Sequence, residues 1–173
     1  LINRSLSSYE PGSIIKPLLS LAGLEHGDLD PHAELDCDGF YQLPGKFGKK
    51  IRDAAKWGHG PINLSGAIEQ SCNKYFITLG IEMGIEKISP LYAAAGLGRY
   101  PMALNDKSQR FTQEKSGLLP QRQKGWLFAD TAYSSIGQGK IKVSPLQAAV
   151  FVGAIANGGN VLQPQLIKEI RDS

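Results

Sequence analysis

The sequence has no long apolar run, because none of its stretches reaches the roughly eighteen uninterrupted apolar residues of a membrane span. Leu1 opens the chain without the basic, apolar and small-residue regions of a signal peptide. There is also no arginine-rich run with interleaved aromatic residues, and the formal charge of +3 is spread along the chain. A nucleic-acid partner is therefore not expected.

Cysteines are few: Cys37 and Cys72 are the only two. They can form one disulfide, remain thiols or bind a metal. An initiator Met is lacking and the sequence stops on "KEIRDS", so we expect a piece of a longer protein. With 173 residues, 42% of them hydrophobic, the chain can still bury the core of one domain or most of one.

Helical patterns alternate with loops, and strand patterns are few. After "PGS", the run "IIKPLLSLAGL" predicts a helix that ends near Gly27, with Pro17 in its first turn. The polar segment 28–60 is too long for an ordinary connection, so we expect short strands or a bound ion to organise it. "NLSGAIEQ" predicts a helix with Ser65 as its N-cap, and a second helix follows over about 74–83.

The C-terminal half has one strong helix signal. In "VSPLQAAVFVGAIANGG", Ser144 is the expected N-cap, Pro145 the first helical residue and Gln147 the partner in a capping box. Before it, "EKISPLYAAAGLG" predicts a short helix closed by glycine, and residues 99–125 read as a long polar loop. The tail "NVLQPQLIKEI" predicts one strand or two.

Ser13 and Lys16 lie three residues apart at the start of the first predicted helix. Residues at this spacing share a helix face, with Cβ atoms about 5–6 Å apart, so Lys16 can reach the Ser13 hydroxyl. The helix start favours developing negative charge, and apolar neighbours favour the neutral lysine that can accept the serine proton. The alternative is a serine cap with a lysine that reaches solvent, because S-x-x-K is common by chance.

Two further motifs favour the catalytic interpretation. In "SCN", Ser71 and Asn73 stand on alternate residues of a helix junction, so both can point one way while Cys72 points the other. In "SSIGQGKIKVSPLQ", a glycine-rich turn precedes the capped helix. With "PGSIIKP", these motifs resemble those of the penicillin-binding transpeptidases. "NRSLSSYEPGS", "WGHG", "EKSGLLP", "IGQG" and "SPLQ" follow the order found in class B enzymes of the elongation type, often called penicillin-binding protein 2.

This resemblance covers residue 3 to the end and implies an α/β (α+β) fold of the penicillin-binding protein and serine β-lactamase type. We expect residues 1–173 to be a partial transpeptidase domain, rich in helix, with an incomplete antiparallel sheet. It implies that Ser13 is the acylated nucleophile, Lys16 its base and Ser71 the relay to the leaving amine. Asn73 is expected to hold the substrate amide.

The family also has a third motif, K-[ST]-G, on a strand that lines the cleft and supplies an oxyanion-hole N–H. "NVLQPQLIKEI" matches the region that normally precedes this strand. We therefore expect the chain to lack the motif and to be inactive, or nearly so, by itself.

The resemblance implies a peptidoglycan D,D-transpeptidase that cross-links stem peptides through an acyl-serine and is acylated by β-lactam antibiotics. A β-lactam sensor or a serine β-lactamase of the same fold is the alternative. Expected partners of the full-length protein are a glycosyltransferase and elongation-complex proteins. The expected location is the periplasmic face of the cytoplasmic membrane, with an anchor that precedes this chain.

We also expect one structural zinc ion, bound by Asp38, Asp53, His59 and Cys72. The mixed O, N and S donors suit a closed tetrahedral site, and the resemblance strengthens the hypothesis because some elongation-type relatives hold zinc with two Asp, a His and a Cys. Cys37 is a rival ligand to Asp38. The alternative is that Cys72 is a small buried hydrophobe and the carboxylates are solvated.

Trp57 and Trp126 are expected to be packing anchors, because large aromatic side chains usually lie in cores. His26 and His32 lie in polar loop sequence and are expected to be solvated.

Overall fold

The structure, a computed structural model, describes residues 2–45, 48–103, 114–121 and 125–165. The chain divides into two compact units, each assembled from separate stretches of sequence. We call residues 10–91 and 120–141 the motif unit, and residues 1–9, 92–119 and 142–173 the terminal unit.

Helices form most of the motif unit. A short 3-10 helix, η2, runs directly into α1, so the expected first helix is present with a tighter first turn. Pro17 lies at the start of α1, where the missing N–H costs no helical hydrogen bond. The helical elements are η2 (Gly12–Ile15), α1 (Lys16–Glu25), α2 (Leu64–Glu69), α3 (Asn73–Met83), α5 (Phe128–Ser135) and most of α4 (Ile85–Ala94), whose residues 92–94 belong to the terminal unit.

Four short strands organise the polar segment between α1 and α2, as the sequence predicted. β1 (Leu35–Cys37) pairs antiparallel with β4 (Gly60–Ile62), and β2 (Phe40–Gln42) pairs antiparallel with β3 (Lys50–Arg52). The result is two separate two-stranded sheets. Such small sheets are stable only when packed on other elements.

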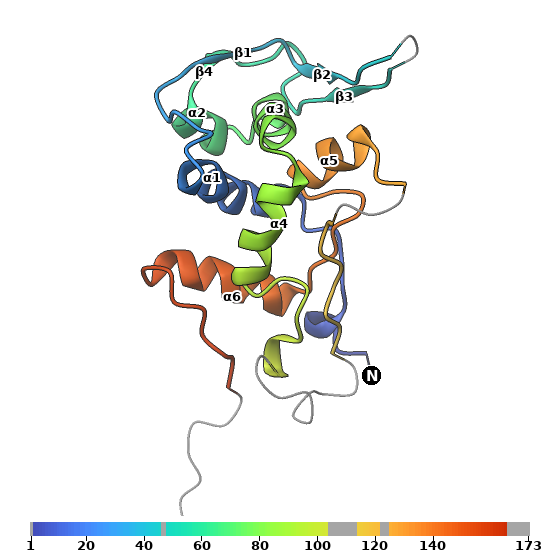
Figure 1. Ribbon diagram of the computed structural model, residues 1–173, viewed down its shortest axis with the longest axis vertical. Helices are drawn as coiled ribbons and strands as arrows, with labels where there is room; N and C mark the ends of the chain where they lie inside the picture. The colour runs from blue at the N-terminus through green and yellow to red at the C-terminus, as the bar shows by residue number, and fades with distance from the viewer. Residues whose placement is uncertain (1, 46–47, 104–113, 122–124, 166–173) are drawn as a thin grey trace, which may run out of the picture. The chain divides into compact units, whose positions relative to one another are not determined.

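Strands β1, β2 and β3 pack on α3, which also contacts α1 and α5, while β4 packs on α2. Figure 1 shows α3 nearly end-on beneath the strands. Its buried face carries Phe76, Ile77 and Leu79, and Gly80 lets α5 approach so closely that an added Cβ would lie 1.9 Å from the Ser135 Oγ. α3 is therefore the central helix of the motif unit.

The terminal unit contains η1 (Arg4–Leu6), η3 (Pro101–Ala103) and α6 (Pro145–Ala156). The predicted start of α6 is confirmed: the Ser144 hydroxyl accepts the Gln147 N–H, and the Gln147 side chain accepts the Ser144 N–H. Isolated bridges join Tyr9 to Val143 and Leu118 to Lys142.

One local prediction was wrong, one helix was missed, and the strand predicted in the tail is absent from the residues that the structure describes there. The N-cap of α2 is Asn63, not Ser65, because the Asn63 side chain accepts the Gly66 N–H. Helix α5 was not predicted, because "FADTAYSS" begins without a small polar N-cap: Leu127 holds that position and Asp130 bonds back to its N–H. Residues 160–165 form no strand, and the rest of the tail lies outside the described residues.

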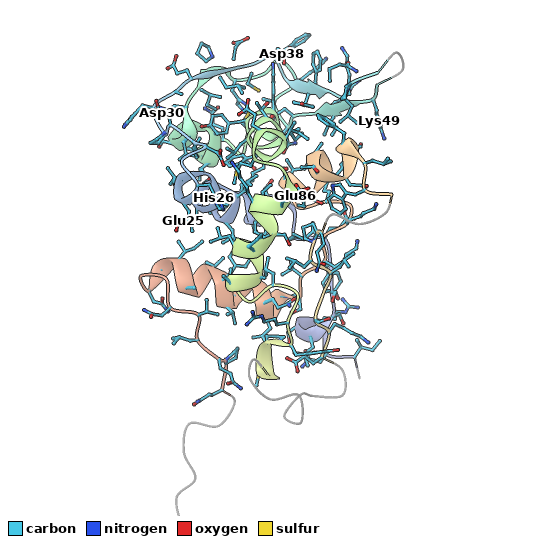
Figure 2. The ribbon with its side chains drawn as sticks, viewed as in Figure 1. Glu25, His26, Asp30, Asp38, Lys49 and Glu86 are labelled. Atoms are coloured by element: carbon cyan, nitrogen blue, oxygen red, sulfur yellow. The ribbon has the colours of Figure 1, made fainter. Side chains whose placement is uncertain are left out.

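His26 and His32 are exposed, as expected. Figure 2 shows His26 beside Glu25, at the end of α1. No helix within the described ranges has the length and apolarity needed to cross a membrane.

Candidate active site and metal cluster

Ser13 and Lys16 differ sharply in exposure. Ser13 lies in η2 and is exposed, whereas the Lys16 side chain retains only 2% of its accessible surface. Ile15, the preceding residue, and Leu19, three residues later, are both fully buried. The Lys16 Nζ lies 5.5 Å from the centre of the Phe76 ring. An ammonium group in such surroundings is costly unless every N–H has an acceptor.

Lys16 finds three acceptors in the S-x-N motif. Its Nζ donates to the Ser71 carbonyl oxygen at 2.7 Å, to the Ser71 Oγ at 3.0 Å and to the Asn73 Oδ1 at 2.8 Å. A lysine ammonium has three donors, so all are used. Between the described side chains of Lys16 and Ser13 there is no hydrogen bond, although the sequence predicted that they share a helix face.

Burial lowers the pKa of Lys16 to about 8, while Asp53 and Cys72 oppose the shift. At pH 7 about a tenth of Lys16 is then neutral. This fraction is far larger than for a solvent-exposed lysine, so the site keeps a usable amine base near neutral pH.

Ser71 has a strained backbone. Its φ of 56° lies in the left-handed region. Among the residues that the structure describes, every other residue with a positive φ is a glycine. The Ser71 N–H bonds the Ile68 carbonyl and the Cys72 N–H bonds the Ala67 carbonyl. This is the Schellman ending of α2, at a position where glycine is usual. A serine there keeps a hydroxyl beside Lys16 at the cost of backbone strain.

Cys72 begins the next helix. Its Sγ accepts the Tyr75 N–H at 3.4 Å and so caps α3, whose first residue is Asn73. The three letters of "SCN" therefore end one helix and start another. This junction points Ser71 and Asn73 at Lys16 and leaves the Cys72 sulfur for a different cluster, as the alternation predicted.

The glycine-rich turn after α5 lies against the backbone that precedes Ser13. The Gly12 N–H donates to the Gly137 carbonyl at 2.9 Å. Gly137 has a φ of 73°, and a Cβ there would lie 2.1 Å from the Gly12 oxygen. Only glycine fits at this approach. The turn thus fixes the residue next to Ser13, a role that the motif letters alone did not reveal.

Four potential metal ligands meet on the other side of the "SCN" junction: Cys37, Asp53, His59 and Cys72. One ligand atom from each lies within 4.8 Å of all the others. The Cys37 Sγ is 3.2 Å from the Cys72 Sγ, 3.4 Å from the His59 Nδ1 and 3.9 Å from the Asp53 Oδ2. Ligand atoms around a tetrahedral zinc are about 3.4–3.8 Å apart, given the usual zinc–ligand distances.

Asp38 is not in this cluster, and its place is taken by Cys37. Asp38 is exposed and its Oδ1 bonds the Lys74 Nζ at 2.8 Å, an interaction that lowers the pKa of Asp38. Figure 2 shows Asp38 at the strand-bearing edge of the motif unit. Adjacent residues of an extended chain point to opposite faces, so only one of the two can point inward. The apolar sulfur of Cys37 is the one that is buried.

Asp53 connects the cluster to the S-x-N motif. Its Oδ2 accepts the Asn73 N–H at 2.6 Å and the Lys74 N–H at 3.3 Å. Burial pushes the pKa of Asp53 upward, but the backbone N–H groups of Lys74 and Asn73 outweigh it and the net shift is downward. Burial raises the pKa of the Cys72 thiol, so a Cys72 thiolate requires a neighbouring positive charge.

The expectation that the chain has no K-[ST]-G sequence was wrong, because Lys115, Ser116 and Gly117 match this pattern. These residues belong to the terminal unit and form no strand; Leu118 makes a single bridge to Lys142. A Cβ on Gly117 would lie 2.2 Å from the Lys142 oxygen, which explains the glycine structurally. They do not have the strand context of the family's third motif.

An exposed serine at a helix start is followed one turn later by a buried lysine that an S-x-N junction holds, which is the arrangement typical of proteins with the S-x-x-K motif. The chain belongs to the family described as penicillin binding protein transpeptidase domain, whose model matches residues 1–173.

Curated relatives include peptidoglycan D,D-transpeptidases named MrdA. The one from Acinetobacter baumannii is 33% identical over 170 residues, which cover 97% of this chain and 25% of the relative. The one from Escherichia coli K12 is 31% identical over 175 residues, which cover 96% of this chain and 26% of the relative. The chain therefore spans about a quarter of the length of these relatives.

Solved structures agree with the fold. Pseudomonas aeruginosa PBP2 matches with a TM-score of 0.82 and 32% identity, over 94% of this chain and 37% of that one. PBP2 in a complex with MreC from Helicobacter pylori matches with a TM-score of 0.79 and 32% identity, over 91% and 29%. The predicted fold class, a helix-rich penicillin-binding transpeptidase fold with small antiparallel sheets, is confirmed.

Proposed function

We propose that the protein of which this chain is part is a peptidoglycan D,D-transpeptidase that works through an acyl-serine intermediate. The observation that carries the proposal is the buried Lys16 amine, held by Ser71 and Asn73 one helical turn from the exposed Ser13. A structural lysine would extend its charge into solvent. Here the charge is buried, and its pKa is lowered to the range of a working base.

In the proposed reaction, the Ser13 Oγ attacks the carbonyl carbon of the stem-peptide bond that will be broken. Neutral Lys16 accepts the Ser13 proton, which requires the Ser13 side chain to turn toward the Nζ. The exposure of Ser13 leaves it room for that rotation. The negative charge that develops on the carbonyl oxygen is stabilised by backbone N–H groups, of which the Ser13 N–H is one.

Ser71 completes the proton path, and Asn73 holds Lys16 in position for it. The Ser71 Oγ is 3.0 Å from the Lys16 Nζ, so it can carry the proton from Lys16 to the amine that leaves. Asn73 uses its Oδ1 for Lys16 and its Nδ2 for the Arg52 carbonyl, which fixes the amide plane. The amine of a second stem peptide then attacks the acyl-serine and loses a proton to neutral Lys16. The ester bond to Ser13 breaks, a proton returns from Lys16 to the Ser13 Oγ, and the new amide is the cross-link.

The chain alone is proposed to acylate slowly. The family's third motif lies on a strand, and no strand within the described residues carries it. Loss of one oxyanion donor typically lowers the rate by about 10²–10³. Restoring the full length of the protein should restore the rate.

Substrate, partners and location are proposals that rest on the relatives. The curated relatives are named as peptidoglycan D,D-transpeptidases, and one similar structure is a complex of PBP2 with MreC. We infer that peptidoglycan stem peptides are the substrate, that β-lactams acylate Ser13, and that elongation-complex proteins with a glycosyltransferase are the partners. The periplasmic face of the cytoplasmic membrane is the proposed location.

The test is to incubate the full-length protein with a fluorescent penicillin and to map the labelled peptide by mass spectrometry. Ser13→Ala should abolish labelling, and Lys16→Arg should slow it strongly because guanidinium stays protonated. Ser65→Ala is the matched control, since Ser65 is also an exposed serine in a first helical turn. Persistent labelling in Ser13→Ala would refute the assignment. Rapid multiple turnover of a chromogenic cephalosporin would instead favour a β-lactamase.

We further propose that Cys37, Asp53, His59 and Cys72 bind one structural zinc. The donor set fits, because two sulfurs, one imidazole nitrogen and one carboxylate oxygen all lie within 4.8 Å of one another and three of the four residues are buried. A metal there would tie β1 and the start of β4 to the "SCN" junction. Zinc supplies positive charge for the two thiolates and stabilises the folded state.

Elemental analysis of protein purified without added metal tests this. We expect about one zinc per chain, and loss of zinc in Cys72→Ser and His59→Ala, together with a lower melting temperature. Wild-type protein without stoichiometric zinc would leave Cys72 as a packing residue.

A further inference from the structure

Trp57 is not a packing anchor, contrary to expectation: 84% of its surface is exposed. A tryptophan this exposed gains nothing from folding. Trp57 is not a residue of either proposed site. Its position on the surface therefore needs another explanation.

The backbone around Trp57 is clamped in place. The Gly58 N–H bonds the Ala55 carbonyl, and the His59 N–H bonds the Cys37 carbonyl. A Cβ on Gly58 would lie 1.9 Å from the Cys37 oxygen, and one on Gly39 would lie 2.8 Å from the Lys56 oxygen. The turn is thus packed tightly against the end of β1. It presents Trp57 to solvent from a fixed backbone, which lowers the entropy cost of binding through this side chain.

Trp57 borders a groove with a volume of about 270 Å³. The floor and walls combine aromatic rings with cations: the Lys50 Nζ lies 3.8 Å from the centre of the Phe40 ring, and the Lys56 Nζ lies 4.7 Å from that of Trp57. The groove is lined by Phe40, Lys50, Arg52, Asp53, Lys56 and Trp57, with Gly39 and Ala54.

The groove carries an excess of positive charge. Lys50, Arg52 and Lys56 are all exposed on it, and Lys49 lies next to it at the β2–β3 hairpin (Figure 2). The one acidic lining residue, Asp53, is buried and accepts backbone N–H groups. A ligand with carboxylates is therefore complementary in charge.

Hydrogen bonds connect the groove to Asn73 of the S-x-N motif. The Asn73 Nδ2 donates to the Arg52 carbonyl at 3.0 Å, and the Asp53 carboxylate accepts the Asn73 N–H at 2.6 Å. The same Asn73 side chain contacts Lys16 through its Oδ1. A chain molecule seated in the groove would therefore lie beside Asn73, a residue of the proposed catalytic motif.

We propose that this groove binds a glycan strand of peptidoglycan whose stem peptides carry carboxylates. This inference rests on the proposed function. The apolar face of a sugar ring stacks on Trp57, as aromatic side chains offer a flat apolar surface with a polar rim. Carboxylates of neighbouring stem peptides pair with Lys50 and Lys56. The groove positions the strand and takes no part in bond making.

The experiment measures binding of soluble, uncross-linked peptidoglycan strands to the full-length protein by calorimetry. Trp57→Ala should weaken binding about ten-fold, and Trp57→Phe should restore part of it. Lys50→Gln and Lys56→Gln should each weaken it about two- to five-fold, more at low salt. The matched control is Lys87→Gln, which removes an exposed charge that pairs with Asp28 and does not line the groove.

Two further probes separate the alternatives. Strands with amidated carboxylates should bind more weakly than untreated strands, and polyglutamate should bind poorly because it lacks sugar rings. Equal binding by all variants, or polyglutamate binding as tight as that of the strands, would overturn the proposal, the latter in favour of an acidic protein partner. Labelling of Ser13 by fluorescent penicillin is measured in the same samples to keep the two proposals distinct. Failure of the wild-type protein to label would refute the proposed function. Groove variants that label normally and bind strands as tightly as wild type would refute only the groove proposal.

Discussion

The Lys16 Nζ donates to both the carbonyl oxygen and the hydroxyl of Ser71, a residue 55 positions later in the chain. The carbonyl bond secures the strained backbone of Ser71, and the hydroxyl bond aligns its side chain. One lysine thereby couples the start of α1 to the junction of α2 and α3. Changes at either residue should affect both the geometry and the proposed chemistry.

The rate of acylation by penicillin should rise with pH. Burial lowers the pKa of Lys16 to about 8, so below that value the neutral amine, and with it the rate, should increase about ten-fold per pH unit. Above pH 8 the rate should level off. The unfolded state binds more protons than the folded state between this pKa and the ordinary lysine value, so Lys16 also adds to stability as pH rises through that window. Circular dichroism at each pH controls for unfolding, and a flat rate profile from pH 6 to 9 would count against Lys16 as the base.

Ser71→Gly should separate strain from chemistry. Glycine adopts a φ of 56° freely, so this variant should be about 1 kcal/mol more stable than Ser71→Ala, which keeps the strain. Both variants lack the hydroxyl and should acylate about 10²–10⁴-fold more slowly than wild type. Urea unfolding and penicillin labelling provide the two measurements. Equal stability of the two variants would contradict the strained backbone, and normal labelling would remove the relay.

Gly137→Ala should disturb the residue next to Ser13. Its new Cβ would meet the Gly12 carbonyl oxygen, in addition to the strain of a positive φ. Gly139→Ala is the matched control, because its φ is 72° but the nearest atom to a Cβ is 3.2 Å away, on Tyr133. We expect the control to cost about 1–2 kcal/mol of stability and to keep its acylation rate when folded. Gly137→Ala should cost more and acylate more slowly; identical behaviour of the two would refute the contact.

Zinc content should distinguish Cys37 from Asp38 as the fourth ligand. Cys37→Ser should lose most of the metal, since the Cys37 sulfur is within 3.2–3.9 Å of the other ligand atoms. Asp38→Asn should retain it, because Asp38 pairs with Lys74 at the surface. The measurement is elemental analysis beside thermal melting. The opposite pattern, with metal lost from Asp38→Asn alone, would restore the ligand set first expected from the sequence.

Local sequence was sufficient where a structure depends on neighbours in the chain. The capping box of α6 and the start of α3 near Lys74 were predicted because N-cap bonds join residues two or three apart. For the polar segment, its length and turn-rich composition left two alternatives, short strands or a bound ion, and the structure has short strands. The missed helix α5 is the converse case, because Leu127 gives no polar capping signal and the packing of α5 on α3 is a long-range contact.

The sequence by itself indicated the fold class through the family motifs, and it named the candidate residues of both sites, with Asp38 expected as a metal ligand and Cys37 as its rival. Tertiary structure decided what those residues contact. It placed Lys16 against Ser71 and Asn73 rather than Ser13, chose Cys37 over its neighbour Asp38, and left Trp57 in solvent. These outcomes depend on which segments pack together. Long-range contacts decide which side chains are buried, where the backbone is strained and which side of an extended segment faces the core, so local sequence cannot determine them.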